Sequence, residues 1–120
     1  MTLDPEKLLA SGASDLPLSY TERDAILYAL SVGLARDALD SRELRYAYEG
    51  SGWLMTMPTF ATVLIPDLFP PQLGWDFEKV LHCEQRLSIY RPLPPAAELM
   101  IDKHVAAVHD LGKGKGAMLY

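Results

Sequence analysis

The sequence is poor in cysteine, in positive charge and in long apolar runs. Cys83 is the single cysteine among 120 residues, so an internal disulfide is excluded and a reducing compartment is expected. Lys and Arg number 11 against 16 for Asp and Glu, which gives a formal net charge of −5. A nucleic-acid-binding domain usually has a basic excess, and a membrane span needs about 18 consecutive apolar residues. We therefore expect neither a nucleic-acid nor a membrane partner.

Targeting signals are also missing from both ends of the sequence. The first residues do not combine a basic region with an apolar run, and the last residues are not a peroxisomal tripeptide. We therefore expect a cytoplasmic protein. The length, with 49% hydrophobic and 22% charged residues, is typical of a globular chain. A single domain over residues 1–120, large enough to bury a core without metal or disulfide, is the expectation.

Two helices are expected in the first third of the chain. Asp4 as a cap and Pro5 as the first helical residue predict a short helix that ends at Ala10. Residues 16–20 are expected to be an extended connector. Thr21, followed by two acidic residues, predicts a helix that continues to about Leu34. Its buried stripe is expected to be the apolar residues at helical spacing: Ile26, Leu27, Leu30 and Leu34.

The rest of the chain favours strands. Alternating apolar and polar residues predict strands at 44–49, 78–90 and 98–109, then a turn at 110–116 and a last strand from 117. Residues 59–65 are expected to form a short helix, with a strand as the alternative because of their β-branched content. Residues 67–75, which include two prolines, are expected to be a loop. Early helices followed by strands, without βαβ alternation, predict an α+β fold with an antiparallel sheet wrapped around a helix.

Residues 112–116 read Gly-Lys-Gly-Lys-Gly and are the first candidate for ligand binding. Backbone N–H groups of a glycine turn, with Lys113 and Lys115, can hold a phosphate. The spacing of a P-loop and its following Ser or Thr are missing. The alternative is a flexible hairpin tip with solvated lysines, which residue types alone favour.

His82, Cys83 and Glu84 bring three reactive side-chain types together. On a strand, Cys83 points to the face opposite His82, so a Cys–His nucleophilic pair is geometrically poor. A zinc site needs three or four converging ligands, and no second cluster with the right spacing follows. A half-buried strand is the favoured interpretation, with ligand contact by His82 left open. The carboxylates elsewhere form no acid–base arrangement, so no catalytic or metal-ligating residue is assigned.

Several segments, in this order, resemble one family. They are residues 20–30 (YTERDAILYAL), 46–49 (YAYE), 57–60 (MPTF), 81–85 (LHCEQ), 91–94 (RPLP) and 110–117 (DLGKGKGA). Together they resemble the N-terminal half of MaoC-like type 2 enoyl-CoA hydratases. This group includes the hydratase domain of peroxisomal multifunctional enzyme type 2. The resemblance implies a hot-dog fold and reversible hydration of a trans-2-enoyl-CoA to an (R)-3-hydroxyacyl-CoA. The CoA thioester is then the substrate, and no separate cofactor is implied.

The resemblance also implies which residues bind substrate. The family's catalytic pattern, Gly-Asp-x-Asn-Pro-x-His, belongs to its C-terminal half and does not occur in this sequence. Two family positions contact the CoA ester, a His-Gly pair and a lysine after an aspartate, and these correspond to His82-Cys83 and Leu111. Cys83 and Leu111 depart from the pattern, so phosphate contact is expected to move to the glycine turn at Lys113, Gly114 and Lys115. The acyl pocket is expected at residues 58–65.

Three hypotheses remain open from the sequence. The chain is the substrate-pocket half of a hydratase, a non-catalytic acyl-CoA-binding or assembly module that pairs with a separate catalytic hot-dog chain, or an inactive remnant. In each case the hot-dog sheet would lack its last strands. An open sheet edge favours pairing with another chain, so a homodimer or docking to a catalytic hot-dog half is expected, with an acyl-CoA as ligand.

Overall fold

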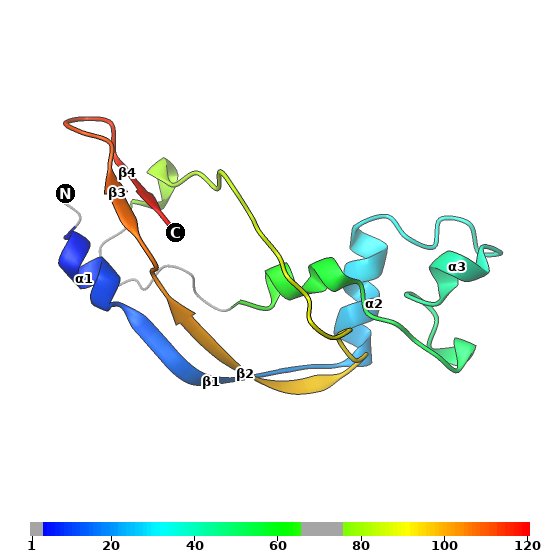
Figure 1. Ribbon diagram of the computed structural model, residues 1–120. Coiled ribbons are helices and arrows are strands. Elements are labelled where there is room, and N and C mark those ends of the chain that lie inside the picture. The colour runs from blue at the N-terminus through cyan, green and yellow to red at the C-terminus, as the bar shows by residue number, and fades with distance from the viewer. Residues whose placement is uncertain (1–3, 66–75) are drawn as a thin grey trace. The chain divides into compact units, whose positions relative to one another are not determined.

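Helices and antiparallel strands are combined in this chain, as expected for an α+β fold. The computed structural model describes residues 4–65 and 76–120. Figure 1 shows the elements, which follow one another as α1 (Pro5–Ala10), β1 (Gly12–Tyr20), α2 (Glu22–Ser31), α3 (Ser41–Leu44), the 3₁₀ helices η1 (Glu49–Ser51), η2 (Pro58–Val63) and η4 (Phe77–Lys79), β2 (Ala97–His104), β3 (Val108–Asp110) and β4 (Ala117–Leu119).

The described strands form two open two-stranded sheets. β1 pairs with β2, and Figure 1 shows the two strands running in opposite directions. Gly12 begins β1 and lies against the end of β2, because a Cβ at Gly12 would be 3.2 Å from the carbonyl oxygen of Lys103. β3 pairs with β4 in an antiparallel hairpin that matches Val108 with Leu119.

The chain divides into two compact units. One comprises residues 4–16, 76–83 and 100–120 of the described chain, and the other residues 17–65 and 84–99. In the first unit α1 lies against β3 and buries Leu8. In the second unit the core cluster consists of buried side chains from β1, α2 and η2: Tyr20, Ala25 and Phe60. Leu99 of β2 packs against this cluster, so one end of the strand pair covers α2 and η2.

The expected helix starts are confirmed. Asp4 caps α1, and its Oδ1 accepts hydrogen bonds from the N–H groups of Glu6 and Lys7 at 3.1 and 3.3 Å. Thr21 and Asp24 form a reciprocal capping box at the start of α2. The N–H of Thr21 donates to Asp24 Oδ2 at 2.8 Å, and this backbone hydrogen bond lowers the pKa of the Asp24 carboxyl. Short-range bonds of this kind need no tertiary contact.

The expected buried face of α2 is wrong in part, since Ile26 and Leu34 are half-buried but the two leucines between them are largely exposed. The helix ends at Ser31, and its buried residues are Ala25 and Ala29, whereas Leu27 and Leu30 are 51% and 48% exposed. Two alanines four residues apart let a neighbouring element come close to the helix axis. Here Ala25 meets Tyr20 and Phe60. The rings of Tyr20 and Phe60 therefore fill the space beside Ala25, where leucine side chains were expected to make the contact.

The strand expected at 44–49 is also wrong. Residues 41–44 form α3 instead, and η1 follows at Glu49–Ser51. Asp40 caps α3 by accepting the N–H of Arg42 at 2.9 Å, and the Arg42 guanidinium donates to the same carboxylate. This local cap outweighs a short alternation of apolar residues, which has no strand beside it to pair with in the described chain.

The strand expected at 78–90 is wrong as well. η4 occupies Phe77–Lys79, and no strand is assigned to residues 80–90. A strand requires a pairing partner, and the alternation of side chains does not supply one. The strand expected at 98–109 forms as β2 and β3, with a break at 105–107 where the N–H of Ala106 donates to the carbonyl of Tyr120.

The remaining expectations concern the extended residues 16–20, the short helix at 59–65, the loop at 67–75 and the turn after residue 110. Residues 16–20 are extended as expected, but as the end of strand β1 rather than as a connector. The short helix expected at residues 59–65 is confirmed as the 3₁₀ helix η2, and the turn and last strand after residue 110 are confirmed as the β3–β4 hairpin. The loop expected at 67–75 lies outside the described residues.

Candidate functional site

The β3–β4 hairpin holds four of the six candidate binding residues. Its loop is closed by two backbone hydrogen bonds of 3.0 Å, from the N–H of Leu111 to the carbonyl of Gly116 and from the N–H of Lys115 to the carbonyl of Gly112. Asp110 ends β3, and its Oδ1 accepts the N–H of Gly112 at 2.8 Å. Leu111, Lys113, Gly114 and Lys115 are thereby brought together on one short turn.

The three glycines of this turn are required by its backbone conformation. Gly112, Gly114 and Gly116 have φ angles of +98°, +77° and +85°. A side chain at these positions would meet no atom within 4 Å, so space does not select glycine here. The left-handed backbone conformation selects glycine instead, because glycine adopts it without the steric cost that other residues bear.

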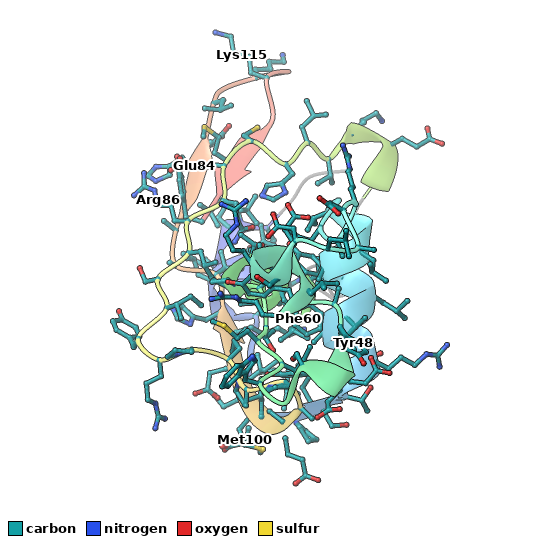
Figure 2. The ribbon with its side chains drawn as sticks, turned by 90° about the vertical axis from the view of Figure 1, so that its right-hand side faces the viewer. Tyr48, Phe60, Glu84, Arg86, Met100 and Lys115 are labelled. Atoms are coloured by element: carbon teal, nitrogen blue, oxygen red, sulfur yellow. The ribbon has the colours of Figure 1, made fainter. Side chains whose placement is uncertain are left out.

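The turn presents donors and positive charge on the surface. Lys113 and Lys115 are exposed, and Figure 2 shows Lys115 at the tip of the hairpin. Within the described chain, the hydrogen bonds leave the backbone N–H groups of Lys113, Gly114 and Gly116 without a protein acceptor. Asp110 is the one acidic residue of the loop, and its carboxylate is engaged by Gly112. Such N–H groups beside two ammonium groups are suited to an anion.

His82 and Cys83 lie on a different segment of the same unit. Both are exposed, in a stretch with no assigned secondary structure, so the half-buried strand expected for them is wrong. Cys83 is a free thiol. Its S–H donates to the carbonyl oxygen of Leu81, with 3.6 Å between Sγ and that oxygen. The ligand contact expected for His82 and Cys83 stays a prediction.

The aromatic cluster beside η2 was missed by sequence reasoning. The ring of Phe60 makes an edge contact with Tyr20 and a tilted contact with Tyr28, each at 5.2 Å between ring centroids. The Tyr20 hydroxyl donates to the carbonyl of Pro94 at 2.6 Å, and Thr56 Oγ1 donates to the same oxygen at 2.9 Å. Pro58 at the start of the 3₁₀ helix was a signal for a constrained segment, but not for its aromatic partners.

The cluster holds η2 in place and leaves part of it accessible. Phe60 is buried, whereas Val63 and Ile65 are 59% and 36% exposed. The segment expected to line an acyl pocket therefore has an anchored side and an exposed apolar side. Its role in an acyl pocket stays a prediction.

Residues 4–65 and 76–120 contain no group of three or more His, Cys, Asp or Glu side chains placed to hold a metal ion. None of the helices in these ranges has the length and apolarity of a membrane span.

Comparison with known proteins supplies the family. Residues 18–120 match the model of the MFE-2 hydratase 2 N-terminal domain. The chain is 38% identical over 120 residues to Enoyl-CoA hydratase 2, peroxisomal, of Arabidopsis thaliana, an alignment that covers 93% of this chain and 38% of the relative. It is 36% identical over 103 residues to Peroxisomal multifunctional enzyme type 2 of Mus musculus, covering 80% of this chain and 14% of that protein.

A bacterial relative agrees with these matches. The chain is 30% identical over 125 residues to 3-hydroxyacyl-thioester dehydratase Y of Mycobacterium tuberculosis, covering 99% of this chain and 40% of that protein. This chain thus spans less than half the length of each of these relatives. The mixture of helices and open antiparallel sheets agrees with a partial hot-dog fold of the MaoC-like type. The chain belongs to the family of MFE-2 hydratase 2 N-terminal domains.

Proposed function

We propose that this chain is the acyl-CoA-binding half of a 2-enoyl-CoA hydratase, or (R)-3-hydroxyacyl-CoA dehydratase, and that proton transfer is carried out by residues outside it. The family assignment supports this, as do relatives named as an enoyl-CoA hydratase and a 3-hydroxyacyl-thioester dehydratase. The sequence lacks the Gly-Asp-x-Asn-Pro-x-His pattern. The chain therefore binds and orients the thioester without itself moving the proton.

The observation that carries the proposal is the donor-rich turn of the β3–β4 hairpin. Coenzyme A has a diphosphate and a 3′-phosphate, which are the most strongly charged groups of the ligand. Lys113 and Lys115 offer two exposed ammonium groups, beside backbone N–H groups with no protein acceptor. Charge-assisted hydrogen bonds are roughly twice as strong as neutral ones. The turn accordingly holds a phosphate of the CoA moiety.

Leu111 gives this turn a different composition from the family pattern. Its side chain is 46% exposed and apolar, so it contacts the pantetheine or adenine part of the ligand rather than a phosphate. A thioester substrate needs no metal or second cofactor from this half of the enzyme.

Isothermal titration of the full chain with crotonyl-CoA tests the binding role. We expect the double substitution Lys113→Ala/Lys115→Ala to raise the Kd about tenfold or more, since the exposed lysines together contribute charge-assisted hydrogen bonds of roughly 1.5 kcal/mol or more in total. The double substitution Lys113→Arg/Lys115→Arg keeps both charges and is expected to retain most of the affinity. Adenosine 3′,5′-bisphosphate, which lacks the thioester arm, should show the same dependence on the two lysines.

The matched control is Lys7→Ala/Lys79→Ala. These two lysines are also exposed, and each already pairs with an aspartate, Asp4 or Asp76. The control removes the same amount of positive charge and should leave the Kd within about twofold, because the ligand does not touch these residues. An equal loss of affinity in both double variants, or none in either, would remove the hairpin turn from the binding site.

A further inference from the structure

One face of the β3–β4 hairpin has accessible aromatic and apolar side chains. The ladder places His109 opposite Met118, and it continues past β4, because the N–H of Tyr120 donates to the carbonyl of Ala107 at 3.0 Å. Alternate residues of a strand share a face. One face therefore holds four exposed side chains, which we name the His109 face: His109, Leu111, Met118 and Tyr120.

Two rings on the His109 face are arranged so that a third ring can stack on them. The rings of His109 and Tyr120 meet edge to face, with 5.5 Å between their centroids and 83° between their planes. A T-shaped pair leaves at least one face of each ring uncovered by the other, and Tyr120 is 54% exposed. The strand residues on the opposite face are half-buried, namely Val108, Ala117 and Leu119. The accessible aromatic surface of the hairpin is thus the His109 face.

The His109 face continues directly into the glycine turn. Leu111 belongs to both, and its N–H closes the turn on the carbonyl of Gly116. Two residues along a strand span about 6.4–6.8 Å, so His109 lies one such step from Leu111. Figure 1 shows β3 and β4 side by side, with the turn joining them at one end. An apolar aromatic surface and an anion site therefore adjoin on one hairpin.

We propose that the His109 face binds the adenine ring of the CoA ester, stacked against Tyr120, while the turn holds the neighbouring phosphate. This inference rests on the proposed function and names the part of the ligand that the two lysines of the turn do not recognise. In coenzyme A a single ribose separates the adenine from the 3′-phosphate, so the ligand needs two adjoining places of different chemistry. A stable protein interface takes about 20–30 residues on each side, whereas four side chains suffice for one planar base.

The chemistry of the four side chains suits a purine. Aromatic side chains stack on nucleobases through their π-faces. The thioether of Met118 is favourable beside an aromatic ring, and Leu111 adds apolar surface at the edge of the turn. Stacking of this kind does not depend on the acyl chain, so the His109 face contributes affinity for the nucleotide end of the ligand and leaves acyl selectivity to other residues.

Isothermal titration of the full chain with adenosine 3′,5′-bisphosphate tests the stacking. We expect Tyr120→Ala to raise the Kd about tenfold, because it removes a stacked ring, and Tyr120→Phe to stay within about twofold of wild type, because it keeps the ring. The backbone hydrogen bonds of Tyr120 do not need its side chain, and far-UV circular dichroism checks that the fold is retained. The matched control is Tyr90→Ala, which removes a tyrosine that is 94% exposed and should leave the Kd unchanged. Equal effects of the two alanine substitutions, or no effect of Tyr120→Ala, would overturn the proposal.

Two fragments of the ligand separate this inference from the proposed function. Inorganic pyrophosphate has the charge without the base, so its Kd should respond to Lys113→Ala/Lys115→Ala and not to Tyr120→Ala. Adenosine has the base without the phosphate, and we expect it to shift the NMR signals of the His109 and Tyr120 rings in the wild-type chain. If adenosine 3′,5′-bisphosphate shifts only the amide signals of the turn, the adenine site is wrong and the phosphate site stands. If adenosine shifts the ring signals while phosphate affinity ignores the lysines, the phosphate site is wrong and the adenine site stands. A chain that responds to none of these ligands would overturn both.

Discussion

At the scale of single residues, one carbonyl group joins three distant parts of the chain. The oxygen of Pro94 accepts from the hydroxyls of Tyr20 and Thr56, at 2.6 and 2.9 Å. Tyr20 is 4% exposed and Thr56 6%, so both donors are removed from water and depend on this acceptor. The bonds fix the end of β1 and the approach to η2 against the chain that precedes β2.

Tyr20→Phe is expected to lower the free energy of unfolding by about 1 kcal/mol at neutral pH, because it removes one hydrogen bond and keeps the ring. Burial raises the pKa of the Tyr20 phenol above its ordinary 10.0. The folded chain then holds this proton more tightly than the unfolded chain, so the contribution is complete below about pH 10 and is lost as the pH rises through the folded pKa. Urea unfolding at a series of pH values should show the difference from wild type shrinking above about pH 10. A difference that does not change with pH would contradict this role of Tyr20.

Asp40 is expected to titrate well below other aspartates. Hydrogen bonds from the Arg42 side chain, and then from its backbone N–H, lower the pKa of Asp40 from 3.8 to about 2. A depressed carboxyl pKa stabilises the folded chain above about pH 3.8, and this support of α3 is lost as the pH falls toward about 2. Titration of the Asp40 side-chain carbon by NMR measures this pKa directly. Arg42→Gln should move it up toward 3.8, and an unchanged titration curve would exclude the ion pair as the cause.

At the scale of elements, the position of a short 3₁₀ or α segment depends on the side chains that pack against it. η2 has no side-chain hydrogen bond at its N-cap, so its position depends on Phe60. That ring contacts Tyr20 from β1 and Tyr28 from α2, and aromatic pairs contribute about 0.5–1.5 kcal/mol beyond their buried area. A single ring thus joins three elements of one unit.

Phe60→Ala is expected to lower the free energy of unfolding by about 3–5 kcal/mol, because it removes a buried ring and leaves a cavity. Phe60→Leu keeps most of the buried volume and should cost clearly less. Urea unfolding followed by circular dichroism measures both. The control Val63→Ala, on the exposed side of the same element, should change stability by no more than about 0.5 kcal/mol. Similar losses from Phe60→Ala and Val63→Ala would show that the cluster does not hold η2.

At the scale of the whole molecule, the surface keeps many large apolar side chains. Within residues 4–65 and 76–120, Leu39, Trp53 and Tyr90 are 90%, 77% and 94% exposed. The longer relatives contain far more chain than this sequence. We propose that further polypeptide covers some of these side chains, because contiguous exposed apolar patches often mark interaction sites.

The chain by itself is expected not to hydrate crotonyl-CoA. Its sequence lacks the Gly-Asp-x-Asn-Pro-x-His pattern of the hydratase half, and general acid–base catalysis requires a positioned acid or base. The loss of enoyl-thioester absorbance measures the reaction, with the full-length Arabidopsis thaliana relative as the positive control. Turnover that survives a second purification and scales with the amount of chain would contradict the expectation.

Local features of the candidate site could be predicted, and its surroundings could not. The hairpin around Gly112 and Lys115 follows from glycine and turn chemistry over a few residues, and the structure has it as expected. The environment of His82 differs from the expected half-buried strand, because alternating side chains do not by themselves provide a strand to pair with. The aromatic cluster around Phe60 was missed because its members are separated by tens of residues, and residue types do not reveal such contacts.

The sequence by itself determined the starts of α1 and α2, the glycine hairpin and the missing catalytic pattern. Asp4, Thr21 and Asp24 act through hydrogen bonds to residues at most three positions away, so their effect needs no other part of the chain. Only the tertiary structure decided that residues 12–20 pair with β2, that the alanines of α2 are its buried residues, and that residues 80–90 have no strand assigned. Pairing and burial depend on which distant segment lies alongside, and periodicity shows that a face is suited to a partner without showing which partner it has.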